Sequence, residues 1–177
     1  MKVTYYVASS MNGLITENEK SIDWLDKFND CGVDFKYKDF YGSVDGLIMG
    51  RKTYDFIKDY DWPYGDKSTW VCSLSENIVN AKGSNIQPQL SAIDSIEEAK
   101  KSGIKHLWVV GGGTLAAHLI NRGLVTNLSV LQMPVIIHSG TPLFKGLIEN
   151  VSLILDSTKT FKEGMIELNY SIINIRN

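Results

Sequence analysis

The sequence predicts an α/β fold in which a mixed, mainly parallel sheet has helices on both faces. Up to about residue 123, short apolar runs alternate with segments whose apolar residues recur at helical spacing. Beyond that point, strand patterns follow one another without helices between them. Parallel βα units followed by antiparallel strands build such a sheet. A chain of 177 residues fits one domain, which we expect to span residues 1–177.

The elements of the first part follow from apolar spacing. We expect strands over residues 3–8, 47–49, 69–73 and 107–110. We expect helices around 37–44 and 53–60, from Ser95, and over 114–122. The uninterrupted apolar runs at 47–49 and 107–110 are typical of strands buried on both faces. Ser95 and Glu98 have the spacing of a capping box, and Gly103 and Gly123 stand where helices commonly end.

The last third predicts antiparallel strands. We expect strands over 126–135 and 151–157, and a final strand in which Ile166, Leu168, Tyr170 and Ile172 alternate with polar residues. This alternation predicts one face toward the core and one toward solvent. In sheets of this kind ligands bind at the carboxyl ends of the parallel strands, so functional residues are expected directly after strands.

Composition excludes several classes of protein. The formal net charge is −2 and no basic run exists, which argues against nucleic-acid and membrane-surface binding. Two cysteines (Cys31 and Cys72) and three scattered histidines form neither a disulfide framework nor a metal-ligand pattern. No signal-peptide pattern or membrane-spanning apolar run is visible. We therefore expect a cytoplasmic protein without a bound metal.

A strand-to-helix turn at residues 49–54 combines glycine with two cations. Arg51 and Lys52 stand at the start of the expected helix, where the helix dipole disfavours positive charge. A bound phosphate would make the positive charge favourable at this position, because backbone N–H groups, the Thr53 hydroxyl and both cations could bind one anion. The alternative is a solvated Arg-Lys pair, with Thr53 as a simple helix cap.

A second turn of this kind, at residues 110–115, contains three consecutive glycines. Glycines let the backbone approach a ligand closely, and the N–H groups of the following helix point toward it. The alternative is a tight turn between packed elements. The Gly-x-Gly-x-x-Gly dinucleotide pattern is absent, and Arg51 stands where a phosphate-binding P-loop needs glycine before its lysine. A third segment, residues 8–15, follows the first strand.

Taken in order, these three segments resemble the dihydrofolate reductase superfamily, and more closely its riboflavin-biosynthesis reductases of the RibD C-terminal type. The resemblance continues through Pro134 to the final hairpin. It implies a three-layer α/β/α dihydrofolate reductase-like fold and NADPH-dependent hydride transfer to a pyrimidine- or pteridine-type substrate. The nearest family activity is reduction of 5-amino-6-(5-phosphoribosylamino)uracil. The resemblance also implies a homodimer formed through a sheet edge.

The same resemblance assigns cofactor roles. It implies that Ala8 meets the nicotinamide carboxamide through its backbone, and that Asn12, Gly13 and Ile15 form a flexible loop closing over the nicotinamide. It implies that the cofactor phosphates contact Gly50, Arg51, Lys52 and Thr53, the cations favouring NADPH over NADH. Ser73 and Leu74 would flank the adenosine end. The diphosphate would lie against Val110, Gly111, Gly112, Gly113, Thr114 and Leu115, with a cis Gly111–Gly112 peptide.

The substrate side of the site is less well defined by the sequence. Counting back from residue 49 places the family's catalytic acid at Asp34, whereas counting forward through Trp24 reaches Asn29, which cannot serve as an acid. Asp26 and Asp30 are further candidates. Trp24, Phe35, Tyr37 and Trp62 could stack on a flat heterocycle or belong to the core. Lys145 or Lys159 could bind a substrate phosphate.

Two other functions remain open. A dihydrofolate reductase proper would share the fold, but residues 10–34 differ from the pattern of that enzyme. A non-catalytic NADPH-binding protein would keep the cofactor segments and lose the acid.

Overall fold

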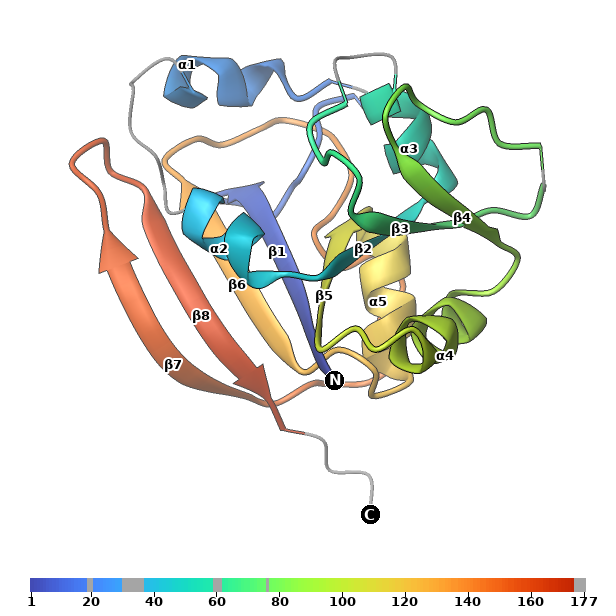
Figure 1. The fold of residues 1–177 in the computed structure, drawn as a ribbon. Coiled ribbons are helices and arrows are strands. Elements are labelled where there is room, and N and C mark those ends of the chain that lie inside the picture. Colours follow the sequence, from blue (N-terminus) through green and yellow to red (C-terminus); the bar gives the residue numbers. More distant parts are fainter. Residues whose placement is uncertain (19–20, 30–36, 59–61, 76, 174–177) are drawn as a thin grey trace.

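The computed structural model describes residues 1–18, 21–29, 37–58, 62–75 and 77–173. One 8-stranded sheet crosses the molecule in the order β4-β3-β2-β5-β1-β6-β8-β7 (Figure 1). Its strands are β1 (Lys2–Ser10), β2 (Gly46–Gly50), β3 (Ser68–Cys72), β4 (Asn85–Gln89), β5 (His106–Gly111), β6 (Asn127–Met133), β7 (Leu153–Thr160) and β8 (Ile166–Ile172). The strands from β4 to β6 in this order (β4, β3, β2, β5, β1 and β6) are parallel to one another. β8 pairs antiparallel with both β6 and β7. The predicted mixed sheet is confirmed.

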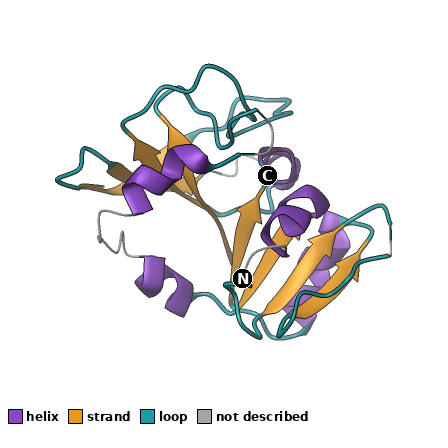
Figure 2. Ribbon diagram, turned by 90° about the horizontal axis from the view of Figure 1, so that it is seen from above, coloured by secondary structure: helices purple, strands orange, loops and turns teal. Residues whose placement is uncertain are grey.

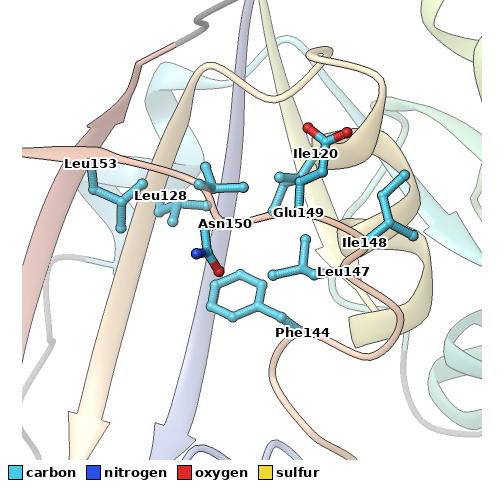
Figure 3. Close-up of a pocket in the computed structure, with 9 residues that line it drawn as sticks. Ile120, Leu128, Phe144, Leu147, Ile148, Glu149, Asn150 and Leu153 are labelled. Atoms are coloured by element: carbon cyan, nitrogen blue, oxygen red, sulfur yellow. The ribbon is translucent and has the colours of Figure 1, made fainter.

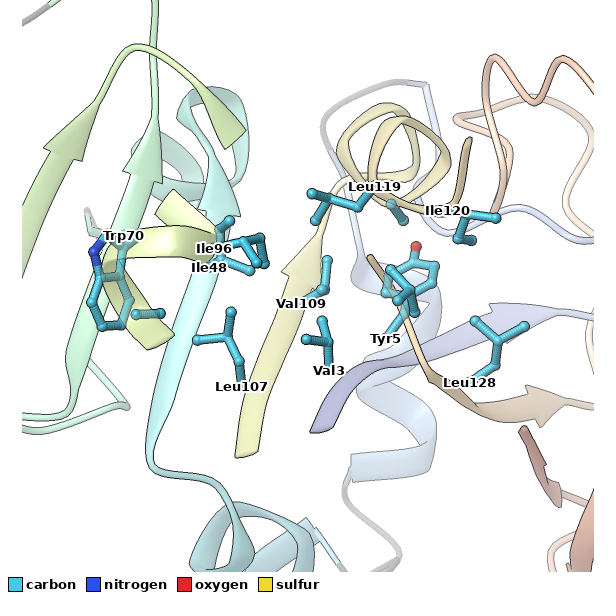
Figure 4. Close-up of a cluster of buried hydrophobic side chains, with 13 residues drawn as sticks. Val3, Tyr5, Ile48, Trp70, Ile96, Leu107, Val109, Leu119, Ile120 and Leu128 are labelled. Carbon is cyan, nitrogen blue, oxygen red and sulfur yellow. The ribbon is translucent and has the colours of Figure 1, made fainter. Parts of the chain in front are cut away.

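Helices lie on both faces of this sheet (Figure 2). They are the 3-10 helix η1 (Asp23–Leu25), α1 (Asp26–Asn29), α2 (Tyr37–Ser43), α3 (Arg51–Lys58), α4 (Ala92–Lys101) and α5 (Gly113–Asn121). One core lies under α4 and α5, where Tyr5, Val109 and Leu119 are each 0% exposed (Figure 4). A second core on the opposite face joins α2 and α3 to the sheet through Leu47, Tyr54 and Trp108. No helix among the described residues is long and apolar enough to span a membrane.

The two cores, one on each face of the sheet, explain why β2 and β5 are buried on both faces. Leu47 and Ile48 are adjacent on β2, and each is 0% exposed because the first packs into one core and the second into the other. Successive side chains of a strand point to opposite faces. The expected burial of β2 and β5 on both faces is confirmed at Leu107 and Trp108, which are 0% and 5% exposed.

The expected capping box at Ser95 is wrong. α4 begins one turn earlier, and Ser91 is its N-cap, accepting hydrogen bonds from the backbone N–H groups of Ile93 and Asp94. Ser95 is buried inside the helix and donates its hydroxyl hydrogen to the Ser91 carbonyl at 2.9 Å. The helix end was predicted correctly, since Gly103 has a φ of 81° directly after the C-cap.

The sequence pattern did not predict β4, a polar edge strand containing Pro88, which an edge position tolerates. β7 begins and ends later than the expected 151–157. The expected division of β8 into a dry and a wet face is wrong. Glu167, from the polar set, is its buried residue, whereas Ile166 and Leu168 are only partly covered. Tyr170 and Ile172 pack partly against the core under α4 and α5, as expected, whereas Ile166 and Leu168 lie beside the edge strand β7, whose residues are all exposed.

Candidate active site at the carboxyl edge of the sheet

The β2–α3 and β5–α5 turns lie side by side at the upper edge of the sheet in Figure 1. β2 pairs in parallel with β5, and Met49 stands opposite Gly111. A Cβ added to Gly50 would lie 3.8 Å from the Gly111 carbonyl oxygen. Two segments that are about sixty residues apart in the sequence therefore meet because the register of neighbouring strands brings their ends together.

The glycine backbone of the second turn lies close to the Thr53 side chain of the first turn. A Cβ added to Gly112 would lie 3.7 Å from Thr53 Oγ1, and one added to Gly111 would lie 4.0 Å from the same atom. The Gly111–Gly112 peptide is cis, which confirms the geometry that the resemblance implied. Side chains at these positions would contact the Thr53 hydroxyl, so the glycines leave this hydroxyl facing bare backbone.

The N-terminus of α5 lies at this turn and has no side-chain cap. Gly112 is the N-cap and makes no side-chain hydrogen bond to the first turn. The first N–H groups of a helix have no partner inside the helix, and together with the helix dipole they favour a bound anion. Thr114 is exposed, and Leu115 anchors the turn by packing partly against the core under α5.

The start of α3 supplies the cations. Arg51 donates from Nε to Asp55 Oδ2 at 2.7 Å and from one terminal nitrogen to the Asn77 carbonyl at 3.0 Å. Lys58 pairs with the other oxygen of Asp55 at 2.9 Å. Burial raises the pKa of the Asp55 carboxyl, but the hydrogen bonds from Lys58 and Arg51 outweigh it, and the net shift is downward. Lys52 is exposed and has no ionic partner in the described part of the chain.

The end of β3 lies next to the start of α3, since Cys72 stands opposite Gly50. Ser73 is 8% exposed, and its Oγ accepts a hydrogen bond from the Ser75 backbone N–H at 3.1 Å. Leu74 is 97% exposed. Both residues therefore border the same edge as Arg51, as an adenosine-binding role requires.

The segment after β1 is fastened to residues 135–143. Asn12 donates from its side-chain nitrogen to the Ile137 carbonyl at 2.7 Å and accepts from the Ile137 N–H at 3.1 Å. Ile15 donates its N–H to the Thr141 carbonyl at 2.9 Å, and the Gly13 carbonyl accepts from the Leu143 N–H at 2.8 Å. The expected closing loop is thus tied along much of its length to a second loop. That second loop also touches α5, because a Cβ on Gly113 would lie 2.2 Å from the Pro142 carbonyl oxygen.

Asp34, the predicted acid, lies outside the described residues, as do Asp30 and Phe35. Asp26 begins α1, whereas the side chain of Asn29 is not described. Trp24 is 5% exposed in a third core that joins η1 to Leu131 and Met133. Tyr37 and Trp62 pack against the core under α2 and α3. Trp24 is thus a core residue, whereas Tyr37 and Trp62 are half-buried at the border of the second core and Ala8 is half-buried at the border of the third.

The resulting geometry fits a dinucleotide phosphate cofactor. An uncapped helix N-terminus, the backbone of Gly111 and Gly112, the Thr53 hydroxyl and two cations lie at one edge. The end of β1 is on one side of them and that of β3 on the other. Such a site offers backbone donors to a diphosphate and positive charge to a further phosphate. Lys145 donates its N–H to the Gly113 carbonyl at 3.3 Å, so it too lies near this edge.

Comparison with known proteins agrees with this fold. The model of the RibD C-terminal domain family matches residues 61–166. The chain is 31% identical over 171 residues to YwjB of Bacillus subtilis (strain 168), covering 96% of this chain and 97% of that protein. It is 26% identical over 177 residues to YyaP of the same organism, covering 93% and 91%. YwjB and YyaP are themselves uncharacterized. The chain belongs to the RibD C-terminal domain family.

Solved structures show the same fold. A protein of Shewanella sp. PV-4 provisionally assigned to riboflavin biosynthesis has a TM-score of 0.86 at 24% identity, covering 98% of this chain and 100% of that one. The deaminase/5-amino-6-(5-phosphoribosylamino)uracil reductase of Thermotoga maritima has a TM-score of 0.73 at 13% identity, over 97% of this chain and 56% of that one. Enterococcus faecalis dihydrofolate reductase complexed with NADP(H) has a TM-score of 0.66 at 16% identity, covering 98% and 97%. The fold is dihydrofolate reductase-like.

Proposed function

We propose that this protein is an NADPH-dependent reductase that transfers a hydride to a pyrimidine- or pteridine-type heterocycle. The observation that carries the proposal is the meeting of the starts of α3 and α5 at one edge of the sheet, where Thr53 faces the backbone of Gly111 and Gly112 and where α3 begins with Arg51 and Lys52. The RibD C-terminal domain family and its reductase-containing structural relatives support this class of reaction. The nearest activity is reduction of 5-amino-6-(5-phosphoribosylamino)uracil.

In this proposal each segment at the carboxyl edge of the sheet binds a different part of the cofactor. The N-terminus of α5 and the backbone of residues 111–113 bind the diphosphate, while Arg51 and Lys52 bind the phosphate that distinguishes NADPH from NADH. Ala8, at the end of β1, orients the nicotinamide through its backbone, and Ser73 and Leu74 border the adenosine. When bound, NADPH supplies the hydride. Asp34 stays the proposed source of the proton that hydride transfer to a C=N bond also requires.

Turnover tests the reductase proposal directly. NADPH oxidation should be detectable with at least one member of a panel of aminopyrimidines and pteridines. Asp34→Asn should slow turnover while NADPH affinity stays unchanged. Turnover of dihydrofolate alone would indicate a dihydrofolate reductase proper. NADPH binding without turnover of any substrate would indicate a non-catalytic NADPH-binding protein.

We further propose that the protein is a cytoplasmic homodimer whose partner is a second copy joined at β7. The eight residues of β7 are all exposed, and β7 ends the sheet, so none of the described strands lies beside its outer backbone groups. Leu153, Ile154 and Leu155 are 39%, 56% and 53% exposed on this strand. Natural edge strands are usually protected by charge, proline or a covering element. Antiparallel pairing of two β7 strands about a twofold axis would cover these side chains.

An apolar groove next to β7 supports this arrangement. It has a volume of about 810 Å³ and lies between the end of α5, β6 and the segment leading into β7 (Figure 3). Leu147 and Ile148 at its rim are 38% and 72% exposed. This groove is lined by none of the cofactor residues, and its hydrophobic rim suits a second protein surface better than a phosphorylated cofactor.

A further inference from the structure

The connection between β3 and β4 passes α3 (Figure 1). Residues 77–81 of this connection form neither helix nor strand, so the hydrogen bonds of the sheet do not hold their backbone. Buried backbone groups of an irregular segment need partners elsewhere, and the segment keeps one position only if those partners are fixed. Two side chains of α3 supply such partners.

Tyr54, on α3, is the central anchor of residues 77–81. Its hydroxyl donates a hydrogen bond to the Val79 carbonyl at 2.7 Å and accepts one from the Ala81 N–H at 2.9 Å. Tyr54 is 0% exposed, so water does not compete for these two bonds. A hydroxyl can donate and accept at once, and here it does both on a single stretch of backbone. The position of residues 77–81 therefore depends on this hydroxyl.

Arg51 contacts the same segment from the first turn of α3. One of its terminal nitrogens donates to the Asn77 carbonyl at 3.0 Å, and its Nε donates to Asp55 at 2.7 Å. A guanidinium carries its N–H donors in one rigid plane, so these two bonds fix its orientation while its other donors can bind a phosphate. The Asn77 carbonyl thus helps to set the direction in which Arg51 presents its charge.

The two contacts are linked through the backbone. Ile78, directly after Asn77, packs partly against the core that contains Tyr54. Because the Tyr54 hydroxyl holds the backbone just beyond this point, the Asn77 carbonyl stays within reach of Arg51. Without the hydroxyl, residues 77–81 would be free to move away from α3. Arg51 would then lose one of the two bonds that orient it.

We propose that Tyr54 is a positioning residue for the selection of NADPH: its hydroxyl fixes residues 77–81, and the Asn77 carbonyl in turn orients Arg51 toward the phosphate that NADH lacks. Because Tyr54 is fully buried, it acts through these backbone contacts and not by touching the cofactor. This assignment rests on the proposed reductase function. It extends cofactor selection from the two cations to a buried side chain on the same helix.

The ring of Tyr54 has a separate, structural role. It packs against Trp62 with ring centroids 5.9 Å apart, in the core under α2 and α3. Tyr54→Phe keeps this ring and removes only the hydroxyl, so it tests the positioning role without creating a cavity. Tyr41→Phe is the matched control. Tyr41 packs against the same core, and its hydroxyl donates to the Tyr64 carbonyl at 2.7 Å, outside residues 77–81.

Titration calorimetry compares the wild type and both variants with three ligands: NADPH, NADH and adenosine 2′,5′-bisphosphate, which carries the adenosine half of NADPH and its distinguishing phosphate. Tyr54→Phe should bind NADPH and the bisphosphate about fivefold more weakly than the wild type, and NADH less than about twofold more weakly, because the misplaced guanidinium binds the extra phosphate. Tyr41→Phe should bind all three ligands as the wild type does. Both variants should melt at a lower temperature, since each leaves a carbonyl without its donor.

Equal weakening of NADPH and NADH by Tyr54→Phe, unchanged binding of the bisphosphate, or the same losses in Tyr41→Phe would overturn the assignment. Amide hydrogen exchange of the wild type gives a second test that does not depend on the folding of a variant. The Ala81 N–H should exchange slowly in the free protein, because it donates to a buried hydroxyl, and rapid exchange would also overturn the assignment.

The same titrations separate this assignment from the proposed function. Failure of the wild type to bind any of the three ligands would overturn the reductase proposal and this assignment together. NADPH-selective binding by the wild type that Tyr54→Phe leaves unchanged would overturn this assignment alone.

Discussion

Arg51 donates a hydrogen bond to Asp55 across one turn of α3, at 2.7 Å. Lys58 pairs with the second oxygen of the same carboxylate. One of the two cations assigned to the cofactor phosphate is therefore partly neutralised by its own helix, whereas Lys52 is exposed. The Arg51–Asp55 ion pair therefore affects how strongly the proposed site discriminates between NADPH and NADH.

Removing the Asp55 charge should strengthen NADPH binding. Asp55→Asn is expected to tighten NADPH by about two- to fivefold at low salt, and less at high salt, because Arg51 then presents its full charge to the phosphate. The cost in stability should be small, about 0.5 kcal/mol, since both side chains are about a third exposed. Titration calorimetry at two salt concentrations measures this, with Asp94→Asn on α4 as control. Weaker NADPH binding would show that Asp55 positions Arg51 instead of competing for it.

Gly113 should tolerate no side chain. A Cβ there would lie 2.2 Å from the Pro142 carbonyl oxygen and 2.9 Å from that of Leu143, so Gly113→Ala must displace backbone and should destabilise by about 1–3 kcal/mol. Gly42→Ala, inside α2 with nothing within 4 Å of an added Cβ, is the matched control. It should be neutral or stabilise by up to about 1 kcal/mol. Urea unfolding compares the two, and equal stability of both variants would refute the close approach of α5 to the 142–143 segment.

His106 should make stability depend on pH below neutrality. Its Nε2 lies 2.8 Å from Thr4 Oγ1 and its Nδ1 lies 3.1 Å from the Ser43 carbonyl, a pattern that the neutral ring satisfies by accepting at Nε2 and donating at Nδ1. Burial is the largest cause of its lowered pKa, and Lys2 adds to it. The unfolded chain therefore takes up the proton first, and stability is lost as pH falls from the ordinary value of 6.5 through the lower folded value.

Urea unfolding at about pH 7.5 and about pH 5.5 tests this expectation. The free energy of unfolding of the wild type should fall more over this range than that of His106→Gln, which lacks the imidazole at position 106. Identical pH dependence of the two proteins would mean that His106 is not responsible.

The proposed dimer should be sensitive to charge on β7. Ile154→Lys is expected to convert the protein to a monomer, because it places an ammonium in the middle of the proposed strand pair. Leu90→Lys is the control, since Leu90 is 58% exposed and lies outside β7. Light scattering after size-exclusion chromatography gives the mass. A wild-type monomer, or an Ile154→Lys dimer, would contradict the proposed interface.

Much of the fold was predictable because its signals are local. The continuous apolar runs of β2 and β5 and the glycines that end α4 and α5 depend on neighbouring residues alone. β4 was missed because its pairing depends on β3, not on its own polar sequence. The start of α4 was misplaced because Ser91 and Ser95 both offer a hydroxyl, and only the packing of the buried Ser95 decides between them.

The candidate site likewise has features that the local sequence predicts and features that only the tertiary structure reveals. Residues 50–53 and 110–115 could be identified because glycine, cations and helix starts are contiguous in the sequence. The meeting of these two segments could not, because it depends on the register of β2 against β5. The attachment of Asn12 to Ile137, 125 residues away, is likewise a tertiary property.

The most direct test of the cofactor site is calorimetric titration of the wild type and of the Arg51→Ala/Lys52→Ala double variant with NADPH and, separately, with NADH. The wild type should bind NADPH more tightly than NADH, and the double variant should lose affinity for NADPH by at least about tenfold more than for NADH. Equal losses for the two cofactors would contradict the assignment of the phosphate to these cations. Failure of the wild type to bind either cofactor would show that the glycine turn is only a feature of the fold.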